Sequence, residues 1–194
     1  MEMQNVLVVS GHPDSENSYA NTAVLENILK LFPDAGISRL DQLYPDFQID
    51  VKSEQEKLVN ADVIIWQFPL HWYSFPALMK KYIDDVYAFG FAHGAGGDKL
   101  KGKKLILSFT TGASEDLYDY GKAMNYPIGD FLPPLIQTAK LCRMEIQEPV
   151  YSMGMQYIPG VYPFETLEII KAKAKDHAHR LATLVSEMLM TKKD

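Results

Sequence analysis

A histidine and several hydroxyl groups stand in residues 10–18, SGHPDSENS, between an apolar run and a helical pattern. The N-terminus of a helix offers free backbone N–H groups and a favourable dipole, so a loop in this place attracts an anion. His12 can donate a ring N–H or carry a positive charge, and Ser18 can donate its hydroxyl. The alternative is structural, with Asn17 or Ser18 capping the helix and binding nothing.

Two well-known phosphate fingerprints are absent from this loop. The sequence has neither G-x-G-x-x-G nor G-x-x-x-x-G-K-[ST] here, so it supports neither a Rossmann dinucleotide site nor a P-loop. An anion held by this loop must therefore belong to another class of ligand.

An aromatic loop follows the second long apolar run. Residues 67–76 read QFPLHWYSFP, with four aromatic rings in eight residues and two prolines that fix the path of the chain. A turn is normally hydrophilic. Exposed rings at a sheet edge indicate a wall for a flat ligand or a surface for a partner.

Two hydroxyls and a glycine end the third apolar run, at Thr110-Thr111-Gly112-Ala113. Alone, this is an ordinary strand exit, but ligands of open α/β sheets bind beyond the carboxyl ends of the strands. The three strand ends together offer an anion pocket, an aromatic wall and a row of donors. This combination predicts a flavin site, with the phosphate of FMN, or the pyrophosphate of FAD, on the first loop.

The elements that position these loops alternate between strands and helices. Continuous apolar runs predict buried parallel strands at residues 6–10, 62–68 and 104–110, with weaker strands at 37–43 and 145–152. Helical patterns cover residues 19–32, 53–61, 76–87, 134–143 and 164–190, and Ser53 with Glu56 forms a possible capping box. The alternation predicts a doubly wound α/β domain. We expect a flavodoxin-like three-layer sandwich with a five-stranded parallel sheet in the order 2-1-3-4-5.

Composition narrows the class further. The 194 residues carry a net charge of −6 and the basic residues form no stripe, so nucleic acid is not expected as a partner. The length indicates one domain over residues 1–194. The single Cys142 excludes an internal disulfide framework and suits a reducing compartment. Glu2 argues against a signal peptide, and no run approaches the roughly 18 apolar residues of a membrane span, so a soluble cytoplasmic protein without a metal site is expected.

These motifs resemble the NAD(P)H:quinone oxidoreductases of the flavodoxin-like fold. The similarity is closest to the bacterial branch, which includes ancillary subunits of glutathione-gated potassium efflux systems. It runs from about residue 6 to about residue 147 and is strongest at residues 62–73, DVIIWQFPLHWY. His12 with Ser18, residues 43–47 and Thr110-Thr111-Gly112 also match.

The resemblance implies flavin contacts in three loops and one catalytic side chain. Tyr118 has the spacing of a tyrosine that animal members place beside the flavin, although Met124 stands where they have a histidine. His71 replaces the usual glutamine, and Ala113 replaces a common glycine, which costs about 1 kcal/mol if that position needs a positive φ. The implied cofactor-binding residues are His12, Ser18, Tyr19, Ala20, Asn21, Pro69, Leu70, His71, Trp72, Tyr73, Thr110, Thr111, Gly112 and Ala113.

The activity that the resemblance implies is two-electron reduction. NAD(P)H reduces the flavin, FMN or FAD, and leaves, and a quinone, or an azo or nitro compound, then takes the electrons in ping-pong order. Backbone N–H groups of residues 111–113 are expected to stabilise the negative charge on the reduced flavin, with the Tyr118 hydroxyl as a helper. The alternative is a regulatory ancillary subunit of a potassium efflux system with incidental reductase activity. A third reading, a one-electron carrier, is disfavoured by His12-Pro13-Asp14, since carriers have a hydroxyl- and glycine-rich phosphate loop.

A homodimer with two sites at the interface is also expected. The aromatic loop over residues 68–75, together with Tyr87, Phe89 and Phe91, presents more apolar surface than a monomer normally leaves bare. The resemblance points the same way, since members of the family pair around the flavin.

Overall fold

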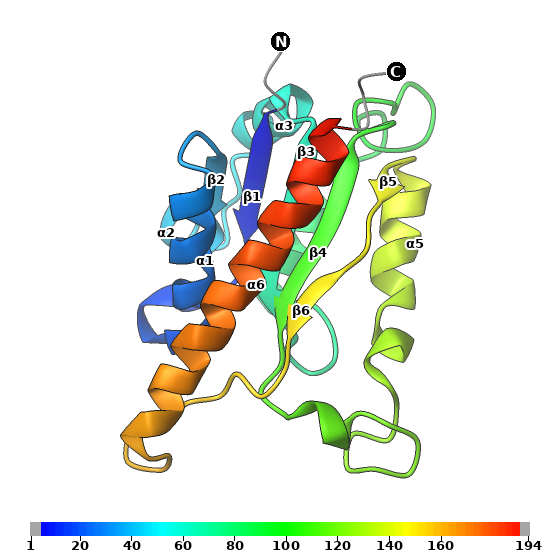
Figure 1. Ribbon diagram of the computed structural model, residues 1–194. Helices are drawn as coiled ribbons and strands as arrows, with labels where there is room; N and C mark the ends of the chain where they lie inside the picture. Colours follow the sequence, from blue (N-terminus) through cyan, green and yellow to red (C-terminus); the bar gives the residue numbers. More distant parts are fainter. Residues whose placement is uncertain (1–4, 191–194) are drawn as a thin grey trace.

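One parallel sheet forms the centre of the structure, a computed structural model that describes residues 5–190 (Figure 1). Its strand order is β2-β1-β3-β4-β5, with β6 also paired to β4, so the predicted order 2-1-3-4-5 is confirmed. The strands are β1 (Val6–Ser10), β2 (Gly36–Arg39), β3 (Val63–Pro69), β4 (Lys104–Thr110), β5 (Glu145–Ile146) and β6 (Val150–Ser152).

The edge of the sheet corrects the prediction of one strand over residues 145–152. The segment is split into β5, which pairs with Lys104 and Leu105, and β6, which pairs with residues 108–110. Pro149 lies between the two and has no N–H to give to a ladder. At the opposite edge, β2 ends at Arg39 instead of continuing to residue 43, and Leu40–Leu43 forms the one-turn helix α2.

Helices cover both faces of the sheet (Figure 1). The helices α1 (Tyr19–Leu31) and α6 (Phe164–Met190) pack together on one face, and α3 (Val51–Asn60), α4 (Ala77–Val86) and α5 (Pro133–Leu141) lie on the other. Side chains of a strand alternate between these two layers. Val8 therefore belongs to the core under α1 and α6, whereas Leu7 and Val9 belong to the core under α3, α4 and α5.

The bounds of the helices agree closely with those predicted from the sequence, but the predicted N-cap of α3 is wrong. The helix α6 has the predicted bounds, and the buried Cys142 follows α5 directly. The capping box of Ser53 and Glu56 is wrong, because Asp50 is the N-cap of α3 and its Oδ1 accepts the Ser53 N–H at 3.0 Å. Aspartate caps a helix as well as serine does, so α3 starts at Val51.

No helix within residues 5–190 is both long enough and apolar enough to cross a membrane. Glu2, on which the expectation about a signal peptide rests, lies outside the described residues.

Candidate functional site

A cleft of about 540 Å³ opens beyond the carboxyl ends of β1, β3, β4 and β6. Four loops line it, and three of them are the loops that the sequence predicts. Of the predicted cofactor-binding residues, Tyr73 and Ala113 do not line the cleft. The lining residues are His12, Asn17, Ser18, Tyr19, Ala20, Asn21, Pro69, Leu70, His71, Trp72, Thr110, Thr111, Gly112, Met155, Gln156, Tyr157 and Ile158.

The first loop turns sharply over the sheet at Gly11. The Gly11 N–H donates to the Gln67 carbonyl at 2.8 Å, and a Cβ at this position would lie 2.7 Å from the Met79 side chain of α4. Only glycine permits this close approach, which brings the loop down onto the ends of β1 and β3. The helix α1 then begins under the cleft at Tyr19.

Ser18 has the capping role that the sequence leaves open, and this role does not use up its hydrogen-bonding capacity. Its Oγ accepts the Asn21 N–H at 3.2 Å, which makes it the N-cap of α1. The hydroxyl proton is not used by this bond, so Ser18 can still donate to an anion in the cleft. Capping and anion binding are therefore compatible at one side chain.

The hydrogen bonding of His12 decides which of its ring nitrogens can serve a ligand. Its Nδ1 accepts the Asp14 N–H at 3.0 Å, so the neutral ring carries its proton on Nε2 and can donate it. Burial and the nearby ring of His71 lower the pKa of His12 below its usual value, while Asp41 and Asp14 act in the opposite direction. Burial also lowers the pKa of His71. The two rings meet edge to face with their centroids 5.9 Å apart.

The aromatic loop after β3 is a tight, strained turn. Trp72 and Tyr73 are consecutive residues in the left-handed region, with φ of 47° and 64°, a conformation that costs roughly 1–2 kcal/mol per non-glycine residue. Trp72 is 93% exposed at the rim of the cleft. The ring of Tyr73 turns away and stacks on Phe131, with centroids 5.0 Å apart. Only one of these two rings is thus available as a wall.

The third loop uses some of the donors that the sequence assigns to a flavin. The Thr111 N–H donates to the Ser152 carbonyl at 3.0 Å, so the expectation that it faces a flavin is wrong. Over residues 5–190, the N–H groups of Gly112 and Ala113 have no protein acceptor. The φ of Ala113 lies outside the left-handed region, so replacing glycine there carries no backbone penalty.

Tyr118 lies near the third loop but does not line the cleft. Burial raises its pKa above the usual value, a hydrogen bond with the Thr111 side chain opposes the rise, and its ring meets Phe131 edge to face. Met124 contacts Tyr73, with 3.9 Å between the Tyr73 hydroxyl and the Met124 sulfur.

Sequence reasoning missed the fourth loop, residues 155–158, which follows β6. The ring of Tyr157 meets that of Tyr19 edge to face at 5.1 Å, which closes the cleft on the side of α1. The signal was present, because a loop at the carboxyl end of a parallel strand is a ligand position. It was missed because the strand before it is weak and broken.

The donors and surfaces fit a flavin better than a metal. Residues 5–190 contain no cluster of three or more His, Cys, Asp or Glu side chains arranged to hold a metal ion. The N-terminus of α1 lines the cleft together with His12 and Ser18, which suits a phosphate. Leu70, Trp72 and Gly112, whose N–H is unused, also line it, and they suit a flat polar heterocycle.

Comparison with known proteins agrees with this geometry. Residues 4–181 match the model of a protein family described as "Flavodoxin-like fold". The glutathione-regulated potassium-efflux system ancillary protein KefF of Enterobacter sp. (strain 638) is 36% identical over 180 residues, which cover 91% of this chain and 94% of that protein. A Bacillus subtilis (strain 168) protein named uncharacterized NAD(P)H oxidoreductase YrkL is 38% identical over 175 residues, covering 90% of this chain and 94% of that one.

A solved structure matches the fold across almost its whole length. The general stress protein 14 of Treponema denticola, in complex with FMN, superposes with a TM-score of 0.82 and 26% sequence identity. The match covers 93% of this chain and 99% of that chain.

Proposed function

The chain belongs to this family of the flavodoxin-like fold, and from that premise we propose that it is a flavin-dependent NAD(P)H oxidoreductase that reduces quinones. The observation that carries the proposal is the cleft at the carboxyl ends of the strands, which is lined by the N-terminus of α1, where an anion would be favoured, and by the exposed ring of Trp72. The name of the Bacillus subtilis relative supports NAD(P)H as the electron donor.

FMN is the flavin that we propose. Its single phosphate is suited to the N-terminus of α1, with the Nε2–H of His12 and the hydroxyl of Ser18 as added donors. The FMN complex of the Treponema denticola protein supports this choice over FAD. The ring system would lie between Leu70, Trp72 and the third loop, where Gly112 and Ala113 have free N–H groups.

When bound, the flavin supplies the redox chemistry, a hydride accepted from NAD(P)H and two electrons passed to the acceptor. The protein would orient both substrates in the open part of the cleft, beside Trp72. Because one open cleft must receive the donor and then the acceptor, we propose ping-pong order. The Gly112 and Ala113 N–H groups would stabilise the negative charge that hydride transfer creates, and Tyr118 would assist through its hydroxyl.

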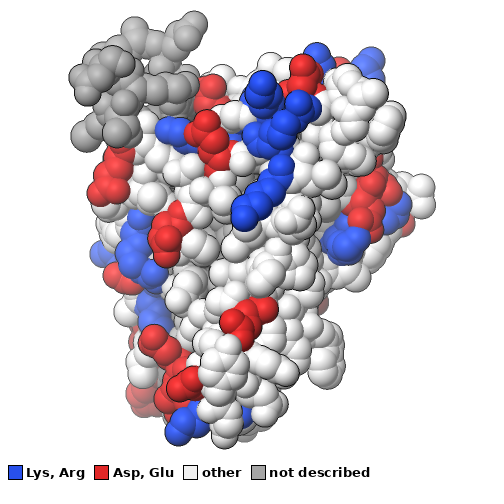
Figure 2. All heavy atoms as spheres, turned by 90° about the vertical axis from the view of Figure 1, so that its right-hand side faces the viewer, with Lys and Arg blue, Asp and Glu red and all other residues white. Residues whose placement is uncertain are grey.

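A homodimer would complete the site. Trp72, at the rim of the cleft, is 93% exposed, and Phe89, in the loop that follows α4, is 71% exposed, which is an unusual amount of bare aromatic surface. The interface expected from the sequence is corrected in two positions, because Tyr87 is buried and Phe91 is partly buried. The side of the molecule that carries α5 shows mostly uncharged surface below a group of Lys and Arg residues, interrupted by a small group of Asp or Glu side chains (Figure 2), and we propose that a second copy covers part of it.

A second candidate function is a regulatory role as an ancillary subunit of a potassium efflux system. The 36% identity with the KefF protein of Enterobacter supports it. Both functions require the same flavin site, so they differ in the partner and not in the cofactor.

Purified protein tests the proposal in three steps. We expect flavin absorbance in the visible region and FMN as the released cofactor by mass spectrometry. NADH or NADPH added without oxygen should bleach the flavin, and a quinone should restore its colour through many turnovers. Protein that neither retains nor takes up any flavin would contradict the proposal. Bleaching without turnover on any quinone, azo or nitro acceptor would favour the regulatory role.

A further inference from the structure

The short helix α2 (Leu40–Leu43) carries a side chain that holds the first loop of the cleft. Oδ2 of Asp41 accepts the Ser15 N–H at 2.7 Å, in the middle of residues 11–18. The Ser15 carbonyl in turn accepts the Thr22 hydroxyl of α1 at 2.7 Å. Ser15 is thereby fixed from two sides, and the side chains that precede and follow it, His12 and Ser18, are set in place.

The single turn of α2 is not stable through its own hydrogen bonds. The helix α2 has four residues, and its N-cap, Arg39, makes no side-chain capping bond. An isolated turn is unfavourable because it fixes several dihedral angles for few hydrogen bonds. The position of Asp41 therefore depends on the buried side chain of Leu40, which anchors α2 in the core, and on what holds the two ends of α2.

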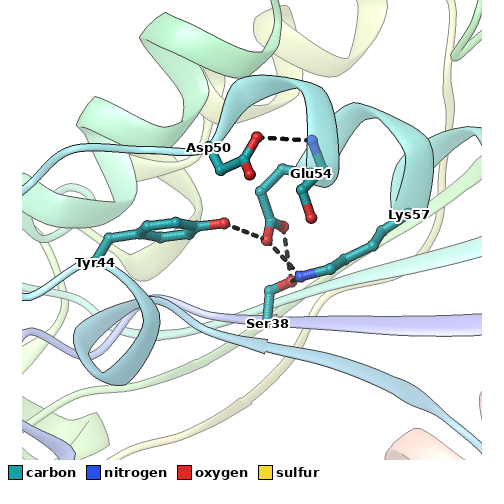
Figure 3. Close-up of polar contacts among 6 residues, drawn as sticks. Ser38, Tyr44, Asp50, Glu54 and Lys57 are labelled. Atoms are coloured by element: carbon teal, nitrogen blue, oxygen red, sulfur yellow. Dashed lines mark hydrogen bonds and ion pairs between the residues drawn. The ribbon is translucent and has the colours of Figure 1, made fainter.

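A buried glutamate holds both ends (Figure 3). Glu54 of α3 is 0% exposed. Its Oε2 accepts the hydroxyl of Ser38, two residues before α2 begins, at 2.7 Å, and its Oε1 accepts the hydroxyl of Tyr44, the C-cap of α2, at 2.8 Å. Lys57, one turn later on α3, completes the group through a 2.5 Å ion pair with Oε1.

Burying the carboxylate of Glu54 costs free energy, so a contribution of Glu54 to function would explain its presence. A buried carboxylate is tolerated only when it is paired and hydrogen-bonded, and replacing such a group by apolar residues is often neutral or stabilising. Glu54 accepts hydrogen bonds from the two residues that bracket α2, Ser38 and Tyr44. Among the hydrogen bonds of residues 5–190, Asp41 makes the one that joins α2 to the first loop of the cleft. A purely apolar contact would leave the rotation of α2, and hence the carboxylate of Asp41, less well defined.

We propose that Asp41 and Glu54 are positioning residues for the phosphate of the cofactor, with Glu54 acting through α2 and Asp41 acting through Ser15. The inference rests on the proposed function, because it assumes that the first loop binds the flavin phosphate. Neither carboxylate would touch the cofactor. Their effect should be confined to the part of the ligand that the first loop contacts.

Riboflavin provides the test, because it has the ring system of FMN and lacks the phosphate. The full-length chain, freed of flavin, is titrated with FMN and with riboflavin by fluorescence. We expect Asp41→Asn and Glu54→Gln each to raise the Kd for FMN roughly tenfold, because each change replaces a charged acceptor by a weaker neutral one and so loosens the first loop. The Kd for riboflavin should change less than about twofold.

Two further variants separate positioning from general damage. Asp46→Asn is the matched control, since Asp46 also accepts a backbone N–H, from Gln48 at 3.0 Å, but in an exposed loop; it should leave both Kd values unchanged. Tyr44→Phe removes one of the bonds to Glu54 and keeps the shape of the side chain. It should reproduce part of the FMN-specific loss even if Glu54→Gln folds poorly.

Each outcome decides the matter. Equal losses for FMN and riboflavin, or no loss for either, would overturn the positioning role. Wild-type protein that binds FMN no more tightly than riboflavin would overturn the proposed phosphate site together with this inference. A wild-type preference for FMN that survives in Asp41→Asn and Tyr44→Phe would overturn the inference alone.

Discussion

The side-chain amide of Gln67, at the end of β3, donates a 2.8 Å hydrogen bond to Oδ1 of Asn21, in the first turn of α1. Both side chains are buried, and the hydroxyl of Thr110, at the end of β4, donates to the same oxygen at 3.2 Å. Asn21 therefore ties two strand ends to the helix that faces the cleft. The floor of the site is a polar cluster inside an apolar fold, and its bonds must all be satisfied.

Asn21→Ala should lower the free energy of unfolding by about 1–3 kcal/mol, because it leaves two buried donors without an acceptor. Urea unfolding of the flavin-free protein measures the change. Asn27→Ala is the control on the same helix, since Asn27 donates to the Ala23 carbonyl within α1. An equal loss of unfolding free energy in the two variants would show that the buried cluster around Asn21 stabilises the fold no more than an ordinary side-chain hydrogen bond does.

His12→Ala combined with Ser18→Ala should weaken FMN binding by several kcal/mol, at about 1.5–3 kcal/mol for each hydrogen bond to a charged group. Calorimetric titration measures the affinity. Ser18→Ala also removes the N-cap of α1, so thermal unfolding is followed in parallel and the binding experiment is run well below the midpoint. Unchanged flavin occupancy in the double variant would refute the assignment of the phosphate loop.

Tyr118→Phe should slow reduction of the flavin by roughly tenfold, the effect of about 1.4 kcal/mol, and leave flavin binding intact. The hydroxyl has no histidine partner at Met124 to relay a proton, so its contribution should stay modest. Anaerobic stopped-flow reduction measures the rate, with Tyr126→Phe in the same loop as the control. A rate within error of wild type would leave the Gly112 and Ala113 N–H groups alone in the role.

Sedimentation at micromolar concentration should show a dimer of the 22.0 kDa chain. Trp72→Asp should shift the equilibrium toward the monomer, because it places a charge in the exposed aromatic surface. Val59→Asp, at an exposed position of α3, is the control. A fully active 22.0 kDa species would show that the second copy is not needed.

Sequence patterns predicted the parts of the molecule that local physics controls. Residues 63–68 are apolar except for Gln67 because β3 is covered on both faces, and the repeat of apolar residues in α6 predicted both of its ends. Right-handed crossovers then left few strand orders to consider. Three of the four loops around the cleft followed from these strands.

The remaining parts depend on contacts that are distant in sequence. The ring of Tyr73 lies outside the cleft because it stacks on Phe131, which is far along the chain. The Thr111 N–H is taken by Ser152 of β6, a strand that Pro149 separates from β5. Neither pairing has a local signal, so neither could be predicted from the residues nearby.

His177 should make the fold sensitive to acid. The ring is 0% exposed, between the Ser108 hydroxyl at 2.9 Å from Nε2 and the Ser152 hydroxyl at 3.0 Å from Nδ1. Burial, and then the charge of Arg180, lower the pKa of His177 to about 3, against an opposing effect of Asp176. In the unfolded chain the pKa returns to about 6.5. Below about pH 6.5 His177 binds a proton in the unfolded state but not in the folded state, so the free energy of unfolding falls as the pH falls.

The expected slope is about 1.4 kcal/mol per pH unit from this one residue, beginning near pH 6 and ending near pH 3, with no effect above the unfolded pKa. Urea unfolding at a series of pH values measures it in wild type and in His177→Gln, and the carboxylates contribute equally to both. The variant should be less stable at pH 7, because glutamine fits between the two serines less well, but its stability should fall less steeply. His179→Gln, on the exposed face of α6, controls for loss of an imidazole. Parallel curves for wild type and His177→Gln would mean that His177 is already protonated in the folded protein, and that its two serine bonds hold a charged ring.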